Sequence, residues 1–123
     1  MNAASLSLVL FSVTLTVIAQ LLLKKGALLL SETLTNNTGL TQLLPELITN
    51  YPLISGLAVY ALSAVTWILA LTKVNVSIAY PFVGLGIVGT TVAGYFIFGE
   101  KISSTTVIGI ILVISGLVFI AKT

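Results

Sequence analysis

The residues best placed to do chemistry are four regularly spaced polar side chains in a largely apolar stretch near the start of the chain. They follow one another at intervals of four residues and are Ser12, Thr16, Gln20 and Lys24. Residues four apart lie on one face of an α-helix, so these side chains form a polar stripe. Because hydroxyl and amide groups in hydrocarbon need hydrogen-bond partners, we expect the stripe to face another helix or a wet cavity.

Structural and ligand-binding interpretations of this stripe both stay open. The hydroxyl groups can donate to carbonyls of their own helix, and the amide of Gln20 can join two helices. Lys24 can anchor the helix at the membrane surface, or it can offer an ammonium group to a phosphate or another anion. Lys25 points about 100° away from the stripe on an ideal helix, so anchoring is the favoured interpretation there.

A second face that combines polar and aromatic groups is predicted in the next apolar stretch. Its members are spaced by four, three and four residues and are Gly56, Tyr60, Ser63 and Trp67. Two large rings beside a hydroxyl group suit an apolar or cationic ligand. Ordinary helix packing would give the same pattern, and it is the simpler interpretation for either ring taken alone.

Small and conformationally unusual residues mark the last two apolar stretches. A proline and three glycines closely follow Tyr80, and they are Pro81, Gly84, Gly86 and Gly89. Such a helix can bend and can approach its neighbours closely, so we expect these residues to act as a conformational hinge. In the last stretch, Gly109 and Gly116 lie on one side of a very apolar helix, which we expect to make the contact with a second subunit.

Four residue types are missing from the chain: aspartate, arginine, histidine and cysteine. Their absence excludes disulfides, thiol nucleophiles and mechanisms that need a histidine base. We expect no bound metal ion, no cofactor and no enzymatic activity. The net charge of +2 is also too small for a nucleic-acid binder, which must contact several phosphates.

The composition identifies the elements that must position these residues as membrane-spanning helices. Of the 123 residues, 58% are hydrophobic and 7% are charged, whereas about a quarter of the residues in a soluble domain are charged. A spanning helix needs about 20 apolar residues. The sequence therefore predicts an all-α membrane protein with one domain, 1–123, and four transmembrane helices, at about 5–30, 52–72, 77–98 and 104–122.

The loops between these helices are short, with one exception. The last three helices should therefore pack as antiparallel neighbours. The exception is the segment 31–51, which we expect to be an interfacial loop with a turn at 36–39. Residues 40–48 are expected to form a short, partly apolar helix at the membrane surface, interrupted at Pro45.

The charged residues fall at or outside the ends of the predicted spans, except for Lys24 and Lys25 in the last part of the first span. No acidic residue lies within a span, which argues against a proton carrier at the centre of the membrane. Glu100 is expected to be solvated or to pair with the adjacent Lys101. The lysines divide two against three between the two sides, so the positive-inside rule does not decide the orientation.

Several short motifs resemble the four-helix members of the drug/metabolite transporter superfamily. They cover nearly the whole chain apart from the segment 31–51, and they are Ala-Gln-Leu-Leu-Leu-Lys at 19–24, Ala-Tyr-Pro at 79–81, Phe-Gly-Glu at 98–100 and the glycine-bounded stretch 109–116. Two branches of the superfamily are similar. The small multidrug resistance branch carries a membrane-embedded glutamate in its first helix, where this chain has Thr16.

The other branch lacks that glutamate and resembles the chain better. It contains the flippase subunits for aminoarabinose-phosphoundecaprenol and related polyprenyl-phosphate lipids. This resemblance implies the movement of such a lipid across the membrane by a homodimer or a heterodimer with a paralogous subunit. It implies that Lys24, with Lys25 as a second candidate, attracts the phosphate, and that Gln20 and Thr16 meet the polar headgroup in transit. The other expected substrate-binding residues, along the path, are Tyr60, Ser63, Trp67 and Tyr80.

Two alternatives from other functional classes stay open. The chain could be an exporter of small organic cations of the small multidrug resistance type, or a nonenzymatic subunit that stabilises a larger membrane complex. All three interpretations place the chain as a multi-pass protein of the inner membrane of a bacterium, in contact with membrane lipid.

Overall fold

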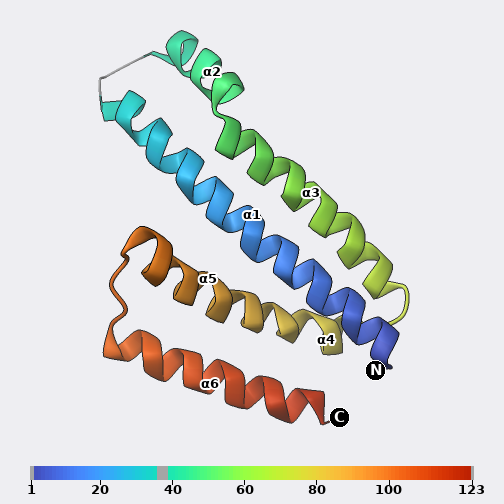
Figure 1. Cartoon of the computed structure of the whole chain (residues 1–123). Coiled ribbons are helices and arrows are strands. Elements are labelled where there is room, and N and C mark those ends of the chain that lie inside the picture. The colour runs from blue at the N-terminus through green and yellow to red at the C-terminus, as the bar shows by residue number, and fades with distance from the viewer. Residues whose placement is uncertain (1, 36–38, 123) are drawn as a thin grey trace.

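The chain forms a bundle of long helices in the computed structural model, which describes residues 2–35 and 39–122 (Figure 1). The described helices are α1 (Ala3–Thr35), α2 (Leu40–Thr49), α3 (Tyr51–Leu71), α4 (Val76–Ala79), the 3-10 turn η1 (Tyr80–Phe82), α5 (Val83–Phe98) and α6 (Ser104–Ala121). The all-α fold class is confirmed.

Four of these helical segments are long and apolar enough to cross a membrane. They are Ala3–Leu34, Tyr51–Leu71, Val76–Phe98 and Ser104–Ala121. The third segment combines α4, η1 and α5. Its helical hydrogen bonding changes at Pro81, where a 3-10 turn joins the two α-helical parts.

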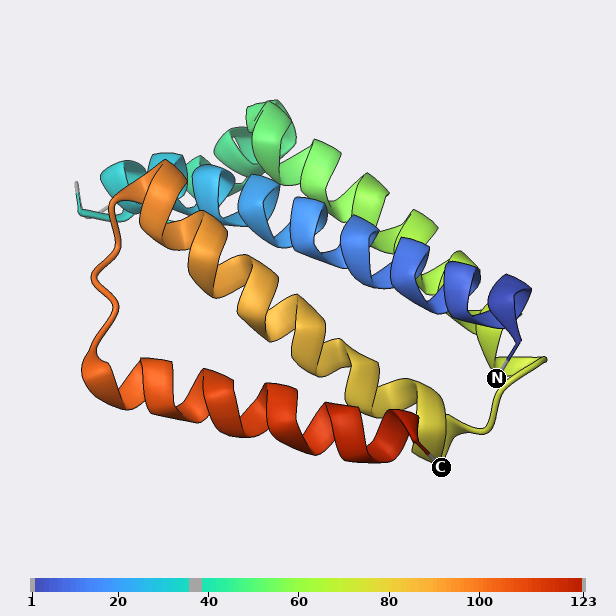
Figure 2. The ribbon, with the colours of Figure 1, turned by 60° about the horizontal axis from the view of Figure 1, so that its bottom comes forward.

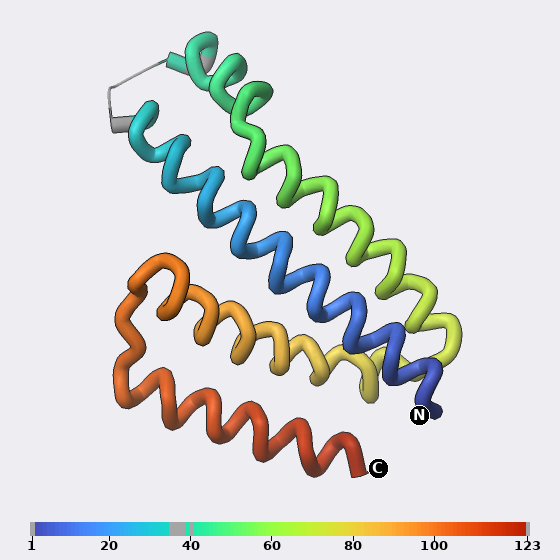
Figure 3. The backbone as a smooth tube through the Cα atoms, in the orientation of Figure 1, coloured from blue at the N-terminus to red at the C-terminus, as the bar shows by residue number. Residues whose placement is uncertain are grey.

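α1 lies in the middle of the bundle, with α3 along one side and α5 along the other (Figures 1 and 2). α6 lies beyond α5 and packs against it and against η1. The backbone in Figure 3 shows that α3 runs antiparallel to α1 and that α6 runs antiparallel to α5. The expectation that the last three spans pack as successive neighbours is therefore wrong for α3 and α5, because α1 separates most of their length.

Two glycines explain why α3 packs so closely against α1. A Cβ atom at Gly26 would lie 2.8 Å from the backbone nitrogen of Leu53, and one at Gly56 would lie 3.0 Å from the side chain of Leu23. Asn50 fixes the end of this contact, since its Nδ2 donates to the Gly26 carbonyl at 2.8 Å while its Oδ1 accepts from the Leu53 N–H at 3.2 Å. This helix pair is therefore set by backbone contacts as well as by apolar packing.

The segment 31–51 was expected to be a loop with a short helix at 40–48. That helix is present as α2, and the segment is more helical than expected. α1 continues to Thr35, and α2 continues through Pro45 without interruption. The proline removes one helical donor, but the helix retains packing against α1 and α3, and the Thr49 hydroxyl donates back to the Pro45 carbonyl at 2.8 Å. Of the expected turn, 36–38 lie outside the described residues.

The buried core is small and lies near the end of the bundle that holds the start of α1 and η1. Its members come from all four spanning segments and the turn after α3, and they are Val9, Val13, Ala70, Val74, Ala79, Phe82 and Leu117. α6 contributes Leu117 alone to this core, and its other large apolar side chains are mostly exposed. In a membrane protein such surfaces face lipid or another subunit.

Candidate functional site

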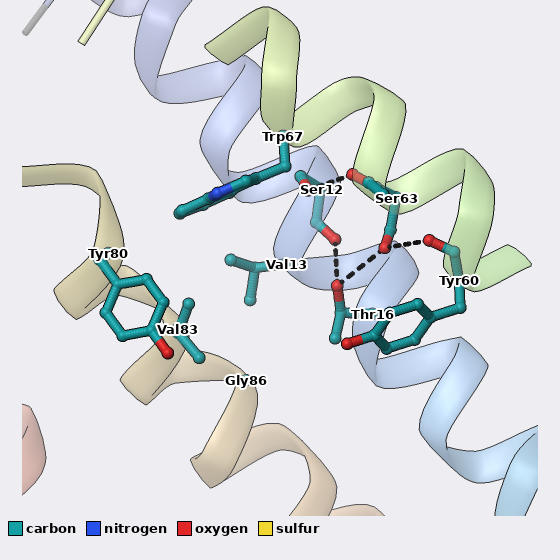
Figure 4. Close-up of a pocket in the computed structure, with 10 residues that line it drawn as sticks. Ser12, Val13, Thr16, Tyr60, Ser63, Trp67, Tyr80, Val83 and Gly86 are labelled. Carbon is teal, nitrogen blue, oxygen red and sulfur yellow. Dashed lines mark hydrogen bonds between the residues drawn. The ribbon is translucent and has the colours of Figure 1, made fainter. Parts of the chain in front are cut away.

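A cavity of about 250 Å³ opens between α1, α3 and the η1–α5 junction (Figure 4). It is lined by Ser12, Val13, Thr16, Tyr60, Ser63, Ala64, Trp67, Tyr80, Val83 and Gly86. We call it the neutral cavity, because none of these side chains carries a formal charge. It brings together five of the predicted binding residues, from two helices and from the turn that contains Pro81.

The polar wall of the neutral cavity is a cluster of three hydroxyl groups (Figure 4). The Ser12 hydroxyl donates to the Ser63 carbonyl at 2.8 Å, and so it joins α1 to α3. The Ser63 hydroxyl donates to the Tyr60 carbonyl at 2.8 Å. Oγ1 of Thr16 lies 3.0 Å from the Ser12 carbonyl and 3.2 Å from Oγ of Ser63.

Thr16 is the adaptable member of this cluster. Its hydroxyl has one proton for two nearby acceptors, so the proton can move between them while the oxygen lone pairs accept from a ligand. Ser12 and Ser63, by contrast, are 2% and 3% exposed and donate to backbone carbonyls. The interpretation that the hydroxyls of the stripe bond within their own helix fits Thr16, which lies within reach of the Ser12 carbonyl, but not Ser12, which donates across to α3.

The apolar wall of the neutral cavity is aromatic. The rings of Trp67 on α3 and Tyr80 on η1 meet edge to face, with centroids 6.4 Å apart and planes at 73° (Figure 4). The Tyr80 side chain is 63% exposed, so the cavity is open beside it. A ligand in this cavity would meet ring faces, hydroxyl groups and no charge.

A second cavity, of about 220 Å³, lies further along α1 toward the C-terminal end of α5. It is lined by Gln20, Leu21, Lys24, Thr90, Gly94, Phe98 and Glu100. We call it the charged cavity. The polar stripe of α1 therefore connects two cavities, with its first two residues in the neutral cavity and its last two in the charged one.

The charged cavity contains an ion pair. Nζ of Lys24 lies 3.4 Å from Oε2 of Glu100, and the two side chains are 43% and 51% exposed. The expectation that Glu100 pairs with Lys101 is therefore wrong, because its partner is Lys24. Gly99, with φ of 66°, ends α5 in the left-handed conformation and turns the chain back over the helix, which aims Glu100 at α1.

Two further predicted binding residues, Gln20 and Lys25, differ in their surroundings. The side-chain amide of Gln20 makes no hydrogen bond with the part of the chain that is described, so it is available to a ligand and does not join two helices. Lys25 lines neither of the two cavities above. It lies at a separate apolar groove of about 630 Å³ between α1 and the end of α5.

The predicted hinge glycines lie at helix contacts. A Cβ atom at Gly84 would lie 2.7 Å from Val113 on α6, and Cβ atoms at Gly86 and Gly89 would lie 3.4 Å and 3.2 Å from Val13 and Val17 on α1. Each glycine thus lets α5 approach a neighbouring helix. Gly109 and Gly116 differ, since no described atom lies within 4 Å of a Cβ built at either position.

Several lining residues of these cavities were not among the predicted binding residues, and they include Ser12, Thr90, Gly94 and Glu100. Ser12 belongs to the polar stripe, so its spacing was a sufficient signal. Thr90, Gly94 and Glu100 come from α5 and the turn after it, and their proximity to α1 depends on how the two helices pack. No spacing rule within α5 could have identified them.

The four apolar helices of the described chain define a small membrane protein. The family model for the Small Multidrug Resistance protein matches residues 38–113. The chain belongs to this family. The matched range includes α3, α5 and most of α6, but it does not include the polar stripe of α1.

Curated relatives from several bacteria have the same name, probable 4-amino-4-deoxy-L-arabinose-phosphoundecaprenol flippase subunit ArnE. The relative from Pseudomonas aeruginosa is 31% identical over 67 residues, 54% of this chain and 58% of the relative. Those from Pseudomonas savastanoi pv. phaseolicola and Salmonella paratyphi B are 34% identical over 61 residues and 36% identical over 69. These two matches cover 50% and 54% of this chain and 54% and 62% of the relatives.

The chain thus spans a little over half the length of the curated relatives that it matches. No solved structure matches it. The family and the four apolar helices together indicate a membrane transporter rather than an enzyme. They place the chain as a multi-pass protein of the bacterial inner membrane.

Proposed function

We propose that the chain is a subunit of a flippase that moves a polyprenyl-phosphate-linked sugar, or a similar lipid, across the bilayer. The observation that carries this proposal is the polar stripe of α1, which links a neutral hydrogen-bonding cavity to a cavity with a lysine. Thr16 and Lys24 are separated by about 12 Å along the helix at 1.5 Å per residue. A sugar and the phosphate attached to it need two such adjacent environments.

The proposed roles follow from the chemistry of each cavity. Lys24 binds the phosphate, with Gln20 as a neighbouring donor, because an ammonium group forms charge-assisted hydrogen bonds with phosphate oxygens. Thr16 presents its hydroxyl group to the sugar, and Ser63 positions that hydroxyl group from the wall of the cavity. The rings of Tyr60, Trp67 and Tyr80 cover its apolar face. Lys25, beside the apolar groove, attracts the lipid phosphate as it approaches from the membrane.

The proposed transport cycle needs a second subunit and a movable helix. The neutral cavity is open beside Tyr80, and α6 exposes a nearly continuous apolar surface that includes Gly109 and Gly116. We propose that a second copy or a paralogous subunit packs on α6 and closes the cavities. Movement of the third span then opens them to each leaflet in turn. The hinge consists of Pro81, Gly84, Gly86 and Gly89.

A second candidate function is the export of small organic cations. The family membership and the aromatic wall formed by Tyr60, Trp67 and Tyr80 favour it, since ring faces attract cations. Proton-coupled export usually uses a titratable group inside a span, and the neutral cavity has Thr16 where the resemblance places a glutamate. This absence favours the lipid substrate over the cation.

A headgroup-transfer assay tests the proposed function. The protein is reconstituted in liposomes that contain a fluorescent polyprenyl-phosphate-linked sugar, and the fraction of headgroups that reaches the other leaflet is followed with time. We expect headgroup transfer by the wild type and a large loss of transfer with Lys24→Ala. The control Lys122→Ala, at the far end of the chain, should transfer headgroups as the wild type does. Unchanged transfer by Lys24→Ala would remove that residue from the mechanism, whereas an inactive wild type that still binds a paralogous subunit would identify an assembly subunit.

A further inference from the structure

Glu100 occupies the place in the charged cavity where a ligand anion would lie. Its Oε2 is 3.4 Å from Nζ of Lys24, the one cationic group that lines this cavity in the described chain. The pair joins the turn after α5 to the polar face of α1. A carboxylate and a phosphate compete for the same ammonium group, so the position of Glu100 determines whether Lys24 can bind a substrate.

The backbone of α5 has a recess that fits this carboxylate. A Cβ atom at Gly94 would overlap with Oε1 of Glu100. The N–H of Glu100 donates to the Gly94 carbonyl at 3.2 Å, and the left-handed Gly99 makes that turn possible. Two glycines and a backbone hydrogen bond therefore place Glu100 against the helix, so its position does not depend on the ion pair alone.

Glu100 also lines a neighbouring cavity, of about 370 Å³, together with Lys101, Thr91 and Thr106. The side chain is 51% exposed, so it is not locked by packing on either side. A rotation away from Lys24 would bring the carboxylate toward another lysine and two hydroxyl groups, which would compensate for the lost partner.

We propose that Glu100 is an internal counter-anion that closes the Lys24 site and is displaced by the phosphate of the substrate. This inference rests on the proposed function only in taking the ligand to be a lipid phosphate. In the empty protein, Glu100 neutralises Lys24 near the membrane boundary. An arriving phosphate contacts Lys24 and the free amide of Gln20 together, and Glu100 turns toward Lys101. On release the carboxylate returns, which keeps the substrate from staying bound.

Equilibrium binding of farnesyl phosphate to the purified full chain tests the proposal, with farnesol as the uncharged control ligand. An exposed ion pair contributes up to about 1 kcal/mol, so Glu100→Gln should bind farnesyl phosphate about two- to fivefold more tightly than the wild type. Gly94→Ala should act in the same direction, because its methyl group displaces the carboxylate without removing its charge. Farnesol binding should not change in either variant.

Glu46→Gln is the matched control, since it removes one negative charge from α2, beside the C-terminal part of α1. It should leave the affinity unchanged, and Lys24→Ala should abolish the gain from Glu100→Gln. Equal or weaker binding by Glu100→Gln, equal gains from Glu46→Gln, or no binding of farnesyl phosphate by any variant would overturn the proposal. Tighter binding by Glu100→Gln without headgroup transfer by the wild type would support the counter-anion and reject the flippase. Headgroup transfer by the wild type without tighter binding by Glu100→Gln would support the flippase and reject the counter-anion.

Discussion

The neutral cavity and the charged cavity lie on the same face of α1 but are built in different ways. In the neutral cavity, Ser12 and Ser63 are nearly inaccessible and donate to backbone carbonyls, so its polar groups are held by the helix pair itself. In the charged cavity, Lys24 and Glu100 are about half exposed and meet through long side chains. The neutral cavity is suited to selecting a ligand by its shape, and the charged cavity is suited to binding and releasing a charged group of the ligand.

The largest effect is expected from removing the charge at Lys24. A hydrogen bond with a charged group contributes about 1.5–3 kcal/mol, so Lys24→Ala should weaken the binding of farnesyl phosphate by about ten- to hundredfold. Lys24→Arg keeps the charge and should retain most of the affinity. Titration of the purified variants with farnesyl phosphate measures both, and equal affinities for Lys24→Ala and the wild type would show that the charged cavity binds no phosphate.

Removing one aromatic side chain from the wall of the neutral cavity should affect the binding of the sugar more than the binding of the phosphate. An aromatic contact contributes about 0.5–1.5 kcal/mol beyond its buried area, so Trp67→Ala should reduce the affinity for a polyprenyl-phosphate-linked sugar about two- to tenfold. The affinity for farnesyl phosphate should stay the same. A competition experiment with the two ligands measures the ratio, and Trp67→Phe serves as the conservative control. A parallel loss for both ligands would mean that the two cavities do not act separately.

Thr16→Val removes the adaptable hydroxyl group at nearly constant volume. The loss of one neutral hydrogen bond costs about 1 kcal/mol, so the affinity for the sugar-linked lipid should fall about fivefold or less. Ser12→Ala is a useful comparison, because its hydroxyl bonds to the Ser63 carbonyl and should affect thermal stability rather than ligand selectivity. If Thr16→Val leaves the ratio of the two affinities unchanged, Thr16 makes no contact with the sugar.

The smallest expected effect is the dependence of the Glu100→Gln gain in affinity on salt concentration. The half-exposed pair between Lys24 and Glu100 is screened, so the advantage of Glu100→Gln over the wild type should fall below about twofold as salt rises from about 0.05 M to about 0.5 M. The stability difference between Ser12→Ala and the wild type should not depend on salt, because it involves a buried, neutral hydrogen bond. Measuring both differences across the same series checks the contrast between the cavities.

Local spacing was enough to predict the helices and the polar stripe, because both depend on residues that are close in the sequence. The stretch from Ser12 to Lys24 keeps its alignment in the structure, and the four spanning segments follow the apolar stretches. The extension of α1 to Thr35 was missed because Ser31 and Glu32 are polar. A helix can continue through polar residues after the apolar stretch has ended.

The arrangement of the helices could not be read in the same way. Short loops predict antiparallel neighbours, but the packing order was decided by the places where backbones can touch, at Gly26 and Gly56. The partner of Glu100 likewise depended on the left-handed turn at Gly99 and on the side of α5 that faces α1. Such contacts join residues far apart in the chain, and their existence follows from packing rather than from spacing.

The central claim is that one face of α1 binds a phosphate-linked lipid headgroup. Mass spectrometry of the lipids that remain bound to the protein after gentle purification from bacterial membranes tests it most directly. The account predicts a polyprenyl-phosphate-linked sugar, or a related phosphate lipid, on the wild type and its depletion on Lys24→Ala. The same ordinary membrane lipids on both proteins, with no enriched polyprenyl phosphate, would contradict the account.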